Sequence, residues 1–273
     1  MLKSGTSSST SRQAVPQGRP ARVFVDVGAH NGETLEIALD PAWGFDRILA
    51  LEPASICHSL LRKFRDRRLS VQPIGLGART ETVPLYGAGL LGASVFKTKR
   101  QKANAEEITT ERIQLVRASE WLETNVPPAA EIFMKFNCEG AECDILDELL
   151  SAGLAARLTS IYVDFDIRKV EGQGHRQAEL ERRLREHQVR YVTTESMGGS
   201  GNAGVARWLA MDCPREQPSW SAALRHRLGI HTPAYIRLTK VAKLLVPARA
   251  YSWLGHRFGR VARAGSSRAK RSR

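Results

Sequence analysis

Short apolar runs alternate with helix-spaced apolar positions in the first third of this chain. The run Val23–Val27 ends in a Gly-Ala-His-Asn-Gly turn, after which apolar residues take a helical spacing. A second run ends at Glu52, a helix-like stretch follows over 55–65, and 69–76 returns to a strand pattern. Strands that alternate with helices are typical of a parallel sheet. We therefore predict a β-α-β-α-β unit here.

The same alternation continues to about residue 211. Residues 80–122 predict a short strand and a glycine-rich loop, followed by a polar stretch at 97–107. The other expected elements are a strand, turn and helix over Glu131–Leu150, a strand at Ser160–Asp166, a helix at about His175–His187, and strands at Tyr191–Thr194 and Ala206–Met211. A glycine-rich segment joins the last two strands and favours an antiparallel closing pair.

Together these elements predict an α/β fold with a Rossmann-like, doubly wound sheet of seven strands. In such sheets ligands bind at the carboxyl ends of the strands. Polar or glycine-containing segments stand at five such ends, namely 26–32, 52, 75–77, 137–140 and 164–166. We expect these segments to converge on one crevice.

The turn at 28–32 and the acid after the second strand have the features of a nucleoside site. Gly28 and Gly32 remove side chains that would block a ligand, and backbone N–H groups of such a loop favour a negative group. Glu52 stands where α/β nucleotide folds place a carboxylate against ribose hydroxyls. The two features together predict a nucleoside ligand.

The glycine spacing favours S-adenosylmethionine over a dinucleotide. The dinucleotide fingerprint is G-x-G-x-x-G, whereas this turn has one glycine fewer and carries Asp26 two residues before Gly28. An acid at this place disfavours a pyrophosphate but suits the ammonium of S-adenosylmethionine. A dehydrogenase and a ligand-free structural turn are the weaker alternatives.

Three motifs occur in a characteristic order: VDVGAHNGETL at 25–35, LEP at 51–53 and KFNCEGAE at 135–142. Through them the chain resembles the FkbM-type family of S-adenosylmethionine-dependent methyltransferases over about residues 22–211. LGAS at 91–94 is similar to the family's small-residue loop. The resemblance implies a class I methyltransferase fold and methylation of hydroxyls, often on sugars, glycolipids or secondary metabolites. The family more often has an aspartate at the place of Asn137, whose amide still offers hydrogen bonds to a cofactor.

The resemblance also implies which residues bind S-adenosylmethionine. The expected cofactor-binding residues are Asp26, Gly28, His30, Asn31, Gly32, Glu52, Gly75, Leu76 and Asn137. Within this set, the methionine moiety is surrounded by Asp26, Gly28, Asn31 and Gly32, and Glu52 holds the ribose. Gly75 and Leu76 border the adenine, and Asn137 faces the sulfonium.

Methyl transfer to a hydroxyl needs an in-line approach and a group that takes up the proton. The expected catalytic residues are Glu139, Asp164 and Asp166, with His30 and His175 as further candidates for the base. Asp164 and Asp166 share one face of their strand, which also suits a divalent cation, but two acids alone define no metal site and we predict none. Glu142 either takes part in the site or supports the following helix N-terminus.

The net charge of +13 is concentrated at one end of the chain. Residues 214–273 hold 14 Lys and Arg and one acid, whereas the rest of the chain holds 27 basic and 27 acidic residues. Trp220, Trp253 and other apolar residues are interleaved with these cations, which is typical of short amphipathic helices at an anionic membrane. Nucleic acid is the rival partner, because the same cations would neutralise phosphates.

The composition predicts three regions: a disordered leader at 1–19, a methyltransferase domain at 20–213 and a basic amphipathic helical tail at 214–273. The leader is rich in Ser, Thr, Gly and Pro and lacks a signal-peptide core, and the four cysteines form no disulfide or zinc pattern. We expect a cytoplasmic protein, peripheral at the inner membrane surface, that methylates a saccharide or glycolipid hydroxyl. The alternative is a binding module with a degenerate methyltransferase fold, tethered to membrane or nucleic acid.

Overall fold

The computed structural model describes residues 19–90, 92–99, 109–199 and 201–227. Most of the predicted leader and most of the predicted tail lie outside these ranges. Of the tail, the structure describes 214–227, which includes helix α7 (Trp220–Arg227). The polar stretch expected at 97–107 is described only as far as Lys99.

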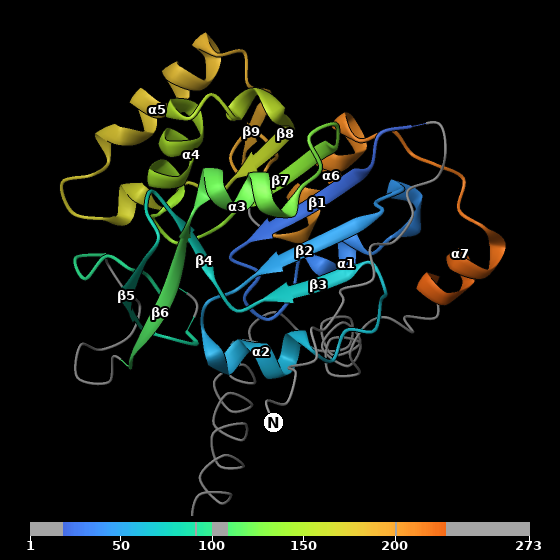
Figure 1. Cartoon of the computed structure of the whole chain (residues 1–273), viewed down its shortest axis with the longest axis horizontal. Helices are drawn as coiled ribbons and strands as arrows, with labels where there is room; N and C mark the ends of the chain where they lie inside the picture. Colours follow the sequence, from blue (N-terminus) through green and yellow to red (C-terminus); the bar gives the residue numbers. More distant parts are fainter. Residues whose placement is uncertain (1–18, 91, 100–108, 200, 228–273) are drawn as a thin grey trace, which may run out of the picture.

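A parallel sheet forms the centre of the fold, with strand order β3-β2-β1-β7-β8-β9 (Figure 1). Its strands are β1 (Arg22–Val27), β2 (Arg47–Leu51), β3 (Leu69–Gln72), β7 (Glu131–Phe136), β8 (Leu158–Val163) and β9 (Tyr191–Thr193). All five strand pairs are parallel. The chain builds outward from β1 to β3 and then returns to β7 on the other side of β1. The order therefore reverses between β1 and β7, which is where such sheets bind ligands.

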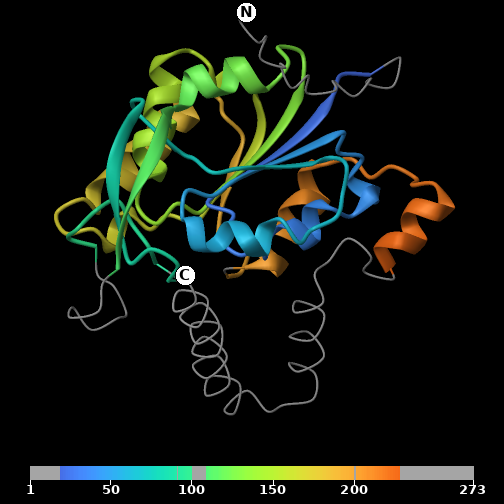
Figure 2. The ribbon, with the colours of Figure 1, turned by 60° about the horizontal axis from the view of Figure 1, so that its bottom comes forward.

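Helices cover both faces of this sheet (Figure 2). One side carries α3 (Ala118–Asn125), α4 (Glu142–Ser151) and α5 (His175–Glu186), and the other carries α1 (Leu35–Ala38), α2 (Ser55–Leu61) and α6 (Asn202–Asp212). Short 3-10 turns lie at η1 (Pro41–Trp43), η3 (Ala155–Arg157) and η4 (Ile167–Lys169). The Rossmann-like α/β fold expected from the hydrophobic pattern is confirmed, as is the helix expected at 175–187.

Alternate residues of each strand enter two separate cores, as the two-residue period of a strand requires. Val23 and Val25 pack on the α3–α4 side, whereas Phe24 packs on the α1–α6 side. Phe24 belongs to a ring cluster in which its centroid lies 5.2 Å from that of Phe45 and 6.2 Å from that of Trp208. Both faces are apolar, and this explains why the strands read as continuous apolar runs.

The predicted antiparallel closing pair is wrong. Residues 206–211 lie in helix α6, and β9 pairs in parallel with β8, so the described main sheet has six strands rather than seven. Val205, Trp208 and Leu209 are buried at helical spacing against the α1–α6 core. A short apolar run fits either a strand or a helix. Here a helix forms because it buries the apolar α1–α6 face of the sheet.

The strand expected at 69–76 is interrupted, because Pro73 cannot donate a ladder hydrogen bond. Residues beyond it form β4 (Gly75–Gly77), which belongs to a second, smaller sheet of order β4-β6-β5 with β5 (Glu81–Tyr86) and β6 (Thr110–Arg117). This sheet lies beside the arrowhead ends of β1, β2 and β3 (Figure 1). Strand β6 was not expected from the sequence.

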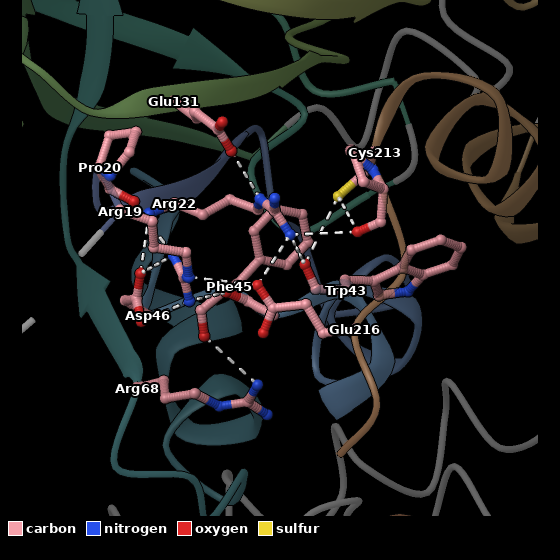
Figure 3. A network of polar contacts seen from close by, with 12 residues as sticks. Arg19, Pro20, Arg22, Trp43, Phe45, Asp46, Arg68, Glu131, Cys213 and Glu216 are labelled. Atoms are coloured by element: carbon pink, nitrogen blue, oxygen red, sulfur yellow. Dashed lines mark hydrogen bonds and ion pairs between the residues drawn. The ribbon is translucent and has the colours of Figure 1, made fainter. Parts of the chain in front are cut away.

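A polar network closes the opposite end of the main sheet (Figure 3). The Arg22 side chain is 6 % exposed and donates to Glu131 at 2.8 Å, to the Trp43 carbonyl at 2.8 Å and to the Pro214 carbonyl at 3.1 Å. Its guanidinium also lies 3.4 Å from the carboxylate of Glu216, the acid of the basic tail. The first residues past the predicted boundary at 213 thus contact the domain, while the boundary itself stays a prediction.

Within the described ranges, no helix combines the length and the apolar character that crossing a bilayer requires.

Candidate active site

A cavity of about 530 Å³ opens at the carboxyl ends of the main strands. The ends of β1, β2, β7 and β8 line it, together with β4 and the start of α6. A further wall comes from the segment after β5, through Gly89, Leu90, Gly92, Ala93 and Val95. The volume lies within the range of small-molecule sites, and the cavity spans the point where the strand order reverses.

Most of the expected site residues line this cavity. They are Gly28, His30, Glu52, Gly75, Leu76, Asn137, Glu139, Asp164 and Asp166. Asp26, Asn31 and Gly32 are not among the lining residues. His175, the other candidate base, begins α5 and also lies outside the lining. The convergence of the five segments on one crevice is confirmed, although residues 75–77 form β4 of the second sheet rather than the end of a main-sheet strand. The role of each residue stays a prediction.

Glu52 is held in a fixed position by the backbone. Its Oε2 accepts from the His30 N–H and its Oε1 from the Ala54 N–H, both at 2.8 Å. The residue is 7 % exposed, and burial raises the pKa of its carboxyl although both N–H groups oppose this. Each carboxylate oxygen has a second lone pair, so the group still has capacity for two hydroxyl donors.

The loop amides do not point at a ligand as the sequence had led us to expect. The N–H groups of Gly28 and Ala29 both donate to the Leu51 carbonyl at 3.0 Å, and that of Gly32 donates to the Ala29 carbonyl at 2.8 Å. With the His30 N–H bound to Glu52, these four donors are used within the protein. A ligand carboxylate would therefore need another partner.

The two glycines of the turn serve close packing. Both have positive φ, 81° at Gly28 and 86° at Gly32, a region that glycine enters without strain. A Cβ on Gly28 would overlap the Asn137 carbonyl oxygen, and one on Gly32 would overlap the Phe64 ring. Gly28 thus lets the ends of β1 and β7 approach each other, and Gly32 makes room for the residue after α2.

Asp26 pairs with Lys135, a residue that sequence reasoning missed. The two stand opposite each other in the β1–β7 register, and the Lys135 ammonium donates to Asp26 at 2.8 Å and to the Gly28 carbonyl at 3.0 Å. Asp26 is 0 % exposed, whereas Lys135 lines the cavity. Asp26 therefore does not face the cavity as expected, and its charge balances a buried cation. A lysine inside an apolar strand was the available signal.

His30 adopts a left-handed backbone with φ 47°, which is unusual for a residue with a side chain. Its Nδ1 lies 3.1 Å from Glu33, while Nε2 is buried with no partner among the described residues. Burial lowers the pKa of this ring, but the bond to Glu33 outweighs it and the net direction is upward. The ring thus brings an unused nitrogen to the cavity wall.

Four charged side chains meet at the ends of β7 and β8. The Lys99 ammonium contacts Glu139 and lies 3.0 Å from Asp166, and the Lys169 ammonium contacts the other oxygen of Asp166. Lys99 and Asp166 are buried, with side chains 1 % and 3 % exposed, whereas Glu139 is 22 % exposed. Lys99 was not expected from the sequence, because it comes from the segment after β5.

The two carboxyls of this cluster differ in acidity. Burial and the hydrogen bond with Asp166 raise the pKa of Glu139, although Lys99 acts in the opposite direction. Burial disfavours the charge on Asp166, but the bond with Glu139 and the two ammonium groups hold its pKa well below the ordinary range. Asp166 is therefore held in its ionised form, whereas Glu139 binds a proton more readily than an ordinary glutamate.

The other acids of the region have distinct surroundings. Burial and the Asp166 charge raise the pKa of Asp164, while a hydrogen bond with Thr194 lowers it. Glu142 is 0 % exposed and accepts from the N–H groups of Cys138 and Gly140 at 3.1 and 3.0 Å. Glu142 therefore supports the turn before α4, the second of the two roles considered for it.

The sequence matches the methyltransferase FkbM domain over residues 26–195. This range contains every strand of the main sheet except the first residues of β1. The chain belongs to the FkbM methyltransferase family. Neither the curated proteins nor the solved structures contain a match. Family membership makes the chain a methyltransferase, for which S-adenosylmethionine is the usual methyl donor.

The cavity of this FkbM methyltransferase fits such a donor in its chemistry. Glu52 offers two acceptors for a pair of ribose hydroxyls, and Gly75, Leu76 and Pro53 form an apolar wall suited to a purine. The Asn137 side-chain amide makes no hydrogen bond within the described part of the chain and lines the same cavity. Across these ranges there is no group of three or more His, Cys, Asp or Glu placed to hold a metal ion.

Proposed function

We propose that this methyltransferase transfers a methyl group from S-adenosylmethionine to a hydroxyl group of a saccharide or glycolipid. The observation that carries the proposal is one cavity lined by two carboxyl groups, that of Glu52, fixed by two backbone N–H groups, and that of Glu139, whose pKa is raised by burial and by Asp166. The first fits the donor and the second fits an acceptor whose oxygen must lose a proton.

The proposed cofactor contacts follow from the cavity wall. Glu52 accepts from the ribose hydroxyls, Gly75 and Leu76 border the adenine, and Asn137 lies near the sulfonium. His30 and the Gly28 carbonyl flank the methionine end, and the residual N–H of Lys135 is available to its carboxylate because an ammonium has three donors and two are used. Asp26, Asn31 and Gly32 act by shaping the loop rather than by contact.

The proposed reaction is a single displacement. Bound S-adenosylmethionine supplies an electrophilic methyl group on sulfur. Glu139 accepts the proton of the acceptor hydroxyl as the oxygen–carbon bond forms and the carbon–sulfur bond breaks, which leaves S-adenosylhomocysteine. A raised pKa brings a carboxylate base closer to the operating pH. Asp164 orients the acceptor, and Asp166 keeps Glu139 in place.

Isothermal titration with S-adenosylhomocysteine tests the donor site, and transfer from methyl-tritiated S-adenosylmethionine to a pool of methyl glycosides or a total lipid extract tests the acceptor class. We expect micromolar binding that Glu52→Ala weakens by about 100-fold. We also expect label in the saccharide or glycolipid fraction, which Glu139→Gln reduces at least about 100-fold. Glu131→Gln, at the opposite end of the strands, is the matched control. A folded protein that binds no S-adenosylhomocysteine would support the degenerate binding module instead.

We also propose that the basic tail places the enzyme at an anionic membrane surface, in the cytoplasm. Support comes from the charge of residues 214–273 and from Trp220, which is 78 % exposed on α7. Sedimentation with vesicles of phosphatidylcholine and phosphatidylserine, compared with phosphatidylcholine alone, is the test. Truncation after Ser219 keeps the Glu216 contacts and should abolish binding. If duplex DNA displaces the full chain from the vesicles, and the truncated chain has lost its affinity for DNA as well, nucleic acid would be the favoured partner.

A further inference from the structure

Lys99 is a buried cation that the proposed chemistry leaves unexplained. Its side chain is 1 % exposed, and its ammonium bridges Glu139 and Asp166 from a segment about forty residues earlier in the chain. A buried ammonium is costly to desolvate, and buried ion pairs are weak evidence for a stabilising role. The position of this charge therefore calls for another explanation.

The segment 92–99, which we name the strap, is seated on the turn that carries Glu139. The Ser94 hydroxyl donates to the Glu139 carbonyl at 2.7 Å and accepts from the Phe96 N–H at 3.1 Å. A Cβ on Gly140 would come 3.2 Å from the Phe96 ring, and Lys99 forms a β-bridge with Val170. The strap thus contacts both the backbone and the side chain of Glu139.

Glu139 itself is held in an unfavourable backbone conformation. Its φ is 59°, in the left-handed region that residues with a side chain rarely adopt. Such strain persists only where the surroundings over-determine it, and it is common at active sites. Here the Ser94 bond and the Lys99 contact supply two of the constraints.

We propose that Lys99 is a positioning residue, which holds the Glu139 carboxylate at the cavity and thereby makes the catalytic base depend on a seated strap. The inference rests on the proposed function of Glu139. It goes further because Lys99, which does not line the cavity, would be needed to hold the base in place. It also links the cavity wall formed by Gly92 and Ala93, which belong to the strap, to the turn that carries Glu139.

The charges around Glu139 predict how the loss of Lys99 would act. Asp166 and Lys169 face it from the end of β8, and Cys138, Asp164 and Glu142 are further ionisable groups of this region. Without Lys99, Glu139 and Asp166 would oppose each other, and two close carboxylates tend to share one proton. The pKa of Glu139 would rise, so the base would be ionised only at higher pH.

The test compares Lys99→Met with Lys97→Met, which removes an exposed lysine of the same strap. We expect Lys99→Met to lower the apparent kcat for methyl transfer to the glycoside or lipid pool by about 100-fold at pH 7, with the KM for S-adenosylmethionine and the Kd for S-adenosylhomocysteine changed less than about twofold. Its activity should recover as pH rises. Lys97→Met should match the wild type, and Lys99→Arg should retain most of the activity.

A second measurement keeps the inference independent of the acceptor and of a folding defect. In protein carrying ¹³C-labelled glutamate and bound S-adenosylhomocysteine, we expect the Glu139 carboxyl to titrate at least about one unit higher in Lys99→Met than in wild type. If Lys99→Met fails to fold, Ser94→Ala should lower kcat with the same unchanged KM, because it loosens the strap and leaves the charges intact.

The outcomes separate the inference from the proposed function. A wild type that binds S-adenosylhomocysteine and methylates a saccharide, with unchanged kcat, pH profile and carboxyl titration in Lys99→Met, overturns the role of Lys99 alone. A wild type without methyl transfer to the saccharide or lipid pool overturns the proposed acceptor. In that case an unshifted Glu139 titration in Lys99→Met would also reject the positioning role.

Discussion

Both ends of the main sheet contain buried cations that join distant segments of the chain. The two ends differ in how many of the neighbouring polar groups have a hydrogen-bond partner. At the amino end, Arg22 has Glu131, Glu216 and two carbonyls as partners. At the carboxyl end, Lys99 and Lys135 stand beside carboxylates with raised pKa values, Glu139 and Asp26. The amino end is held by many contacts around one cation, whereas the carboxyl end keeps hydrogen-bonding groups that a ligand could use.

Strained backbone and unpaired buried atoms also occur at the carboxyl end, although they are not confined to it, since Gln188 has positive φ and the Arg157 Nε has no partner among the described residues. His30 and Glu139, two of the described non-glycine residues with positive φ, both line the cavity. The buried atoms without a partner in the described structure include the His30 Nε2 and the second carboxylate oxygen of Asp26. A buried charge alone therefore does not mark a functional site. We expect the combination of a buried charge, a strained backbone and unmet hydrogen bonds to be the better marker.

The largest expected effect comes from Gly28→Ala at the cavity end. The new Cβ would overlap the Asn137 carbonyl and the residue would keep a positive φ, so we expect more than about 4 kcal/mol lower free energy of unfolding, or no folded protein. Gly153→Ala is the matched control, since its φ is 71° but nothing lies within 4 Å of the new atom. Urea unfolding measures both, and equal losses would contradict the packing argument.

At the amino end, Arg22→Met should cost about 3 kcal/mol of unfolding free energy, because the Trp43 and Pro214 carbonyls lose a charged donor. Its affinity for S-adenosylhomocysteine should stay within about twofold of wild type, since the network lies at the far end of the strands. Urea denaturation measures the free energy of unfolding, and calorimetric titration of the same sample measures the affinity for S-adenosylhomocysteine. A large loss of affinity in folded protein would show that the two ends are coupled.

Glu52→Ala should reduce S-adenosylhomocysteine affinity by about 100-fold, which corresponds to about 2.7 kcal/mol. It removes the proposed ribose acceptors and also frees the His30 and Ala54 N–H groups. Glu52→Gln keeps one acceptor oxygen and should lose less. Binding of both variants with wild-type affinity would exclude a ribose-binding role for this residue.

The smallest expected effect is a pH dependence of stability from Glu142, whose pKa burial raises to about 7. The folded state holds this proton more tightly than the unfolded chain, so the contribution is fully present below about pH 4.5 and is lost as pH rises through 7. Between pH 5 and 7.5 we expect a decline of about 2 kcal/mol that Glu142→Gln lacks. Identical slopes in urea unfolding would contradict this.

Local sequence patterns predicted much of this fold, because the spacing of apolar residues that distinguishes a helix from a strand can be recognised within a short stretch of sequence. The strand at 131–136 and the helix at 175–187 needed only apolar spacing and flanking turns. The segment 206–211 needed more, because its short apolar run fits a strand or a helix and the uncovered sheet face decided the outcome. Strand β6 was missed since its alternation becomes meaningful only beside β5.

The sequence by itself determined the order of elements, the family motifs and the presence of Glu52, Asn137 and Glu139 at strand ends. Only the tertiary structure decided which partner each charge takes. Asp26 faces Lys135 through strand register, and Glu139 meets Lys99 because the segment after β5 folds back over the sheet. Such pairings join residues far apart in the chain, and the burial that makes them consequential exists only once the chain has folded.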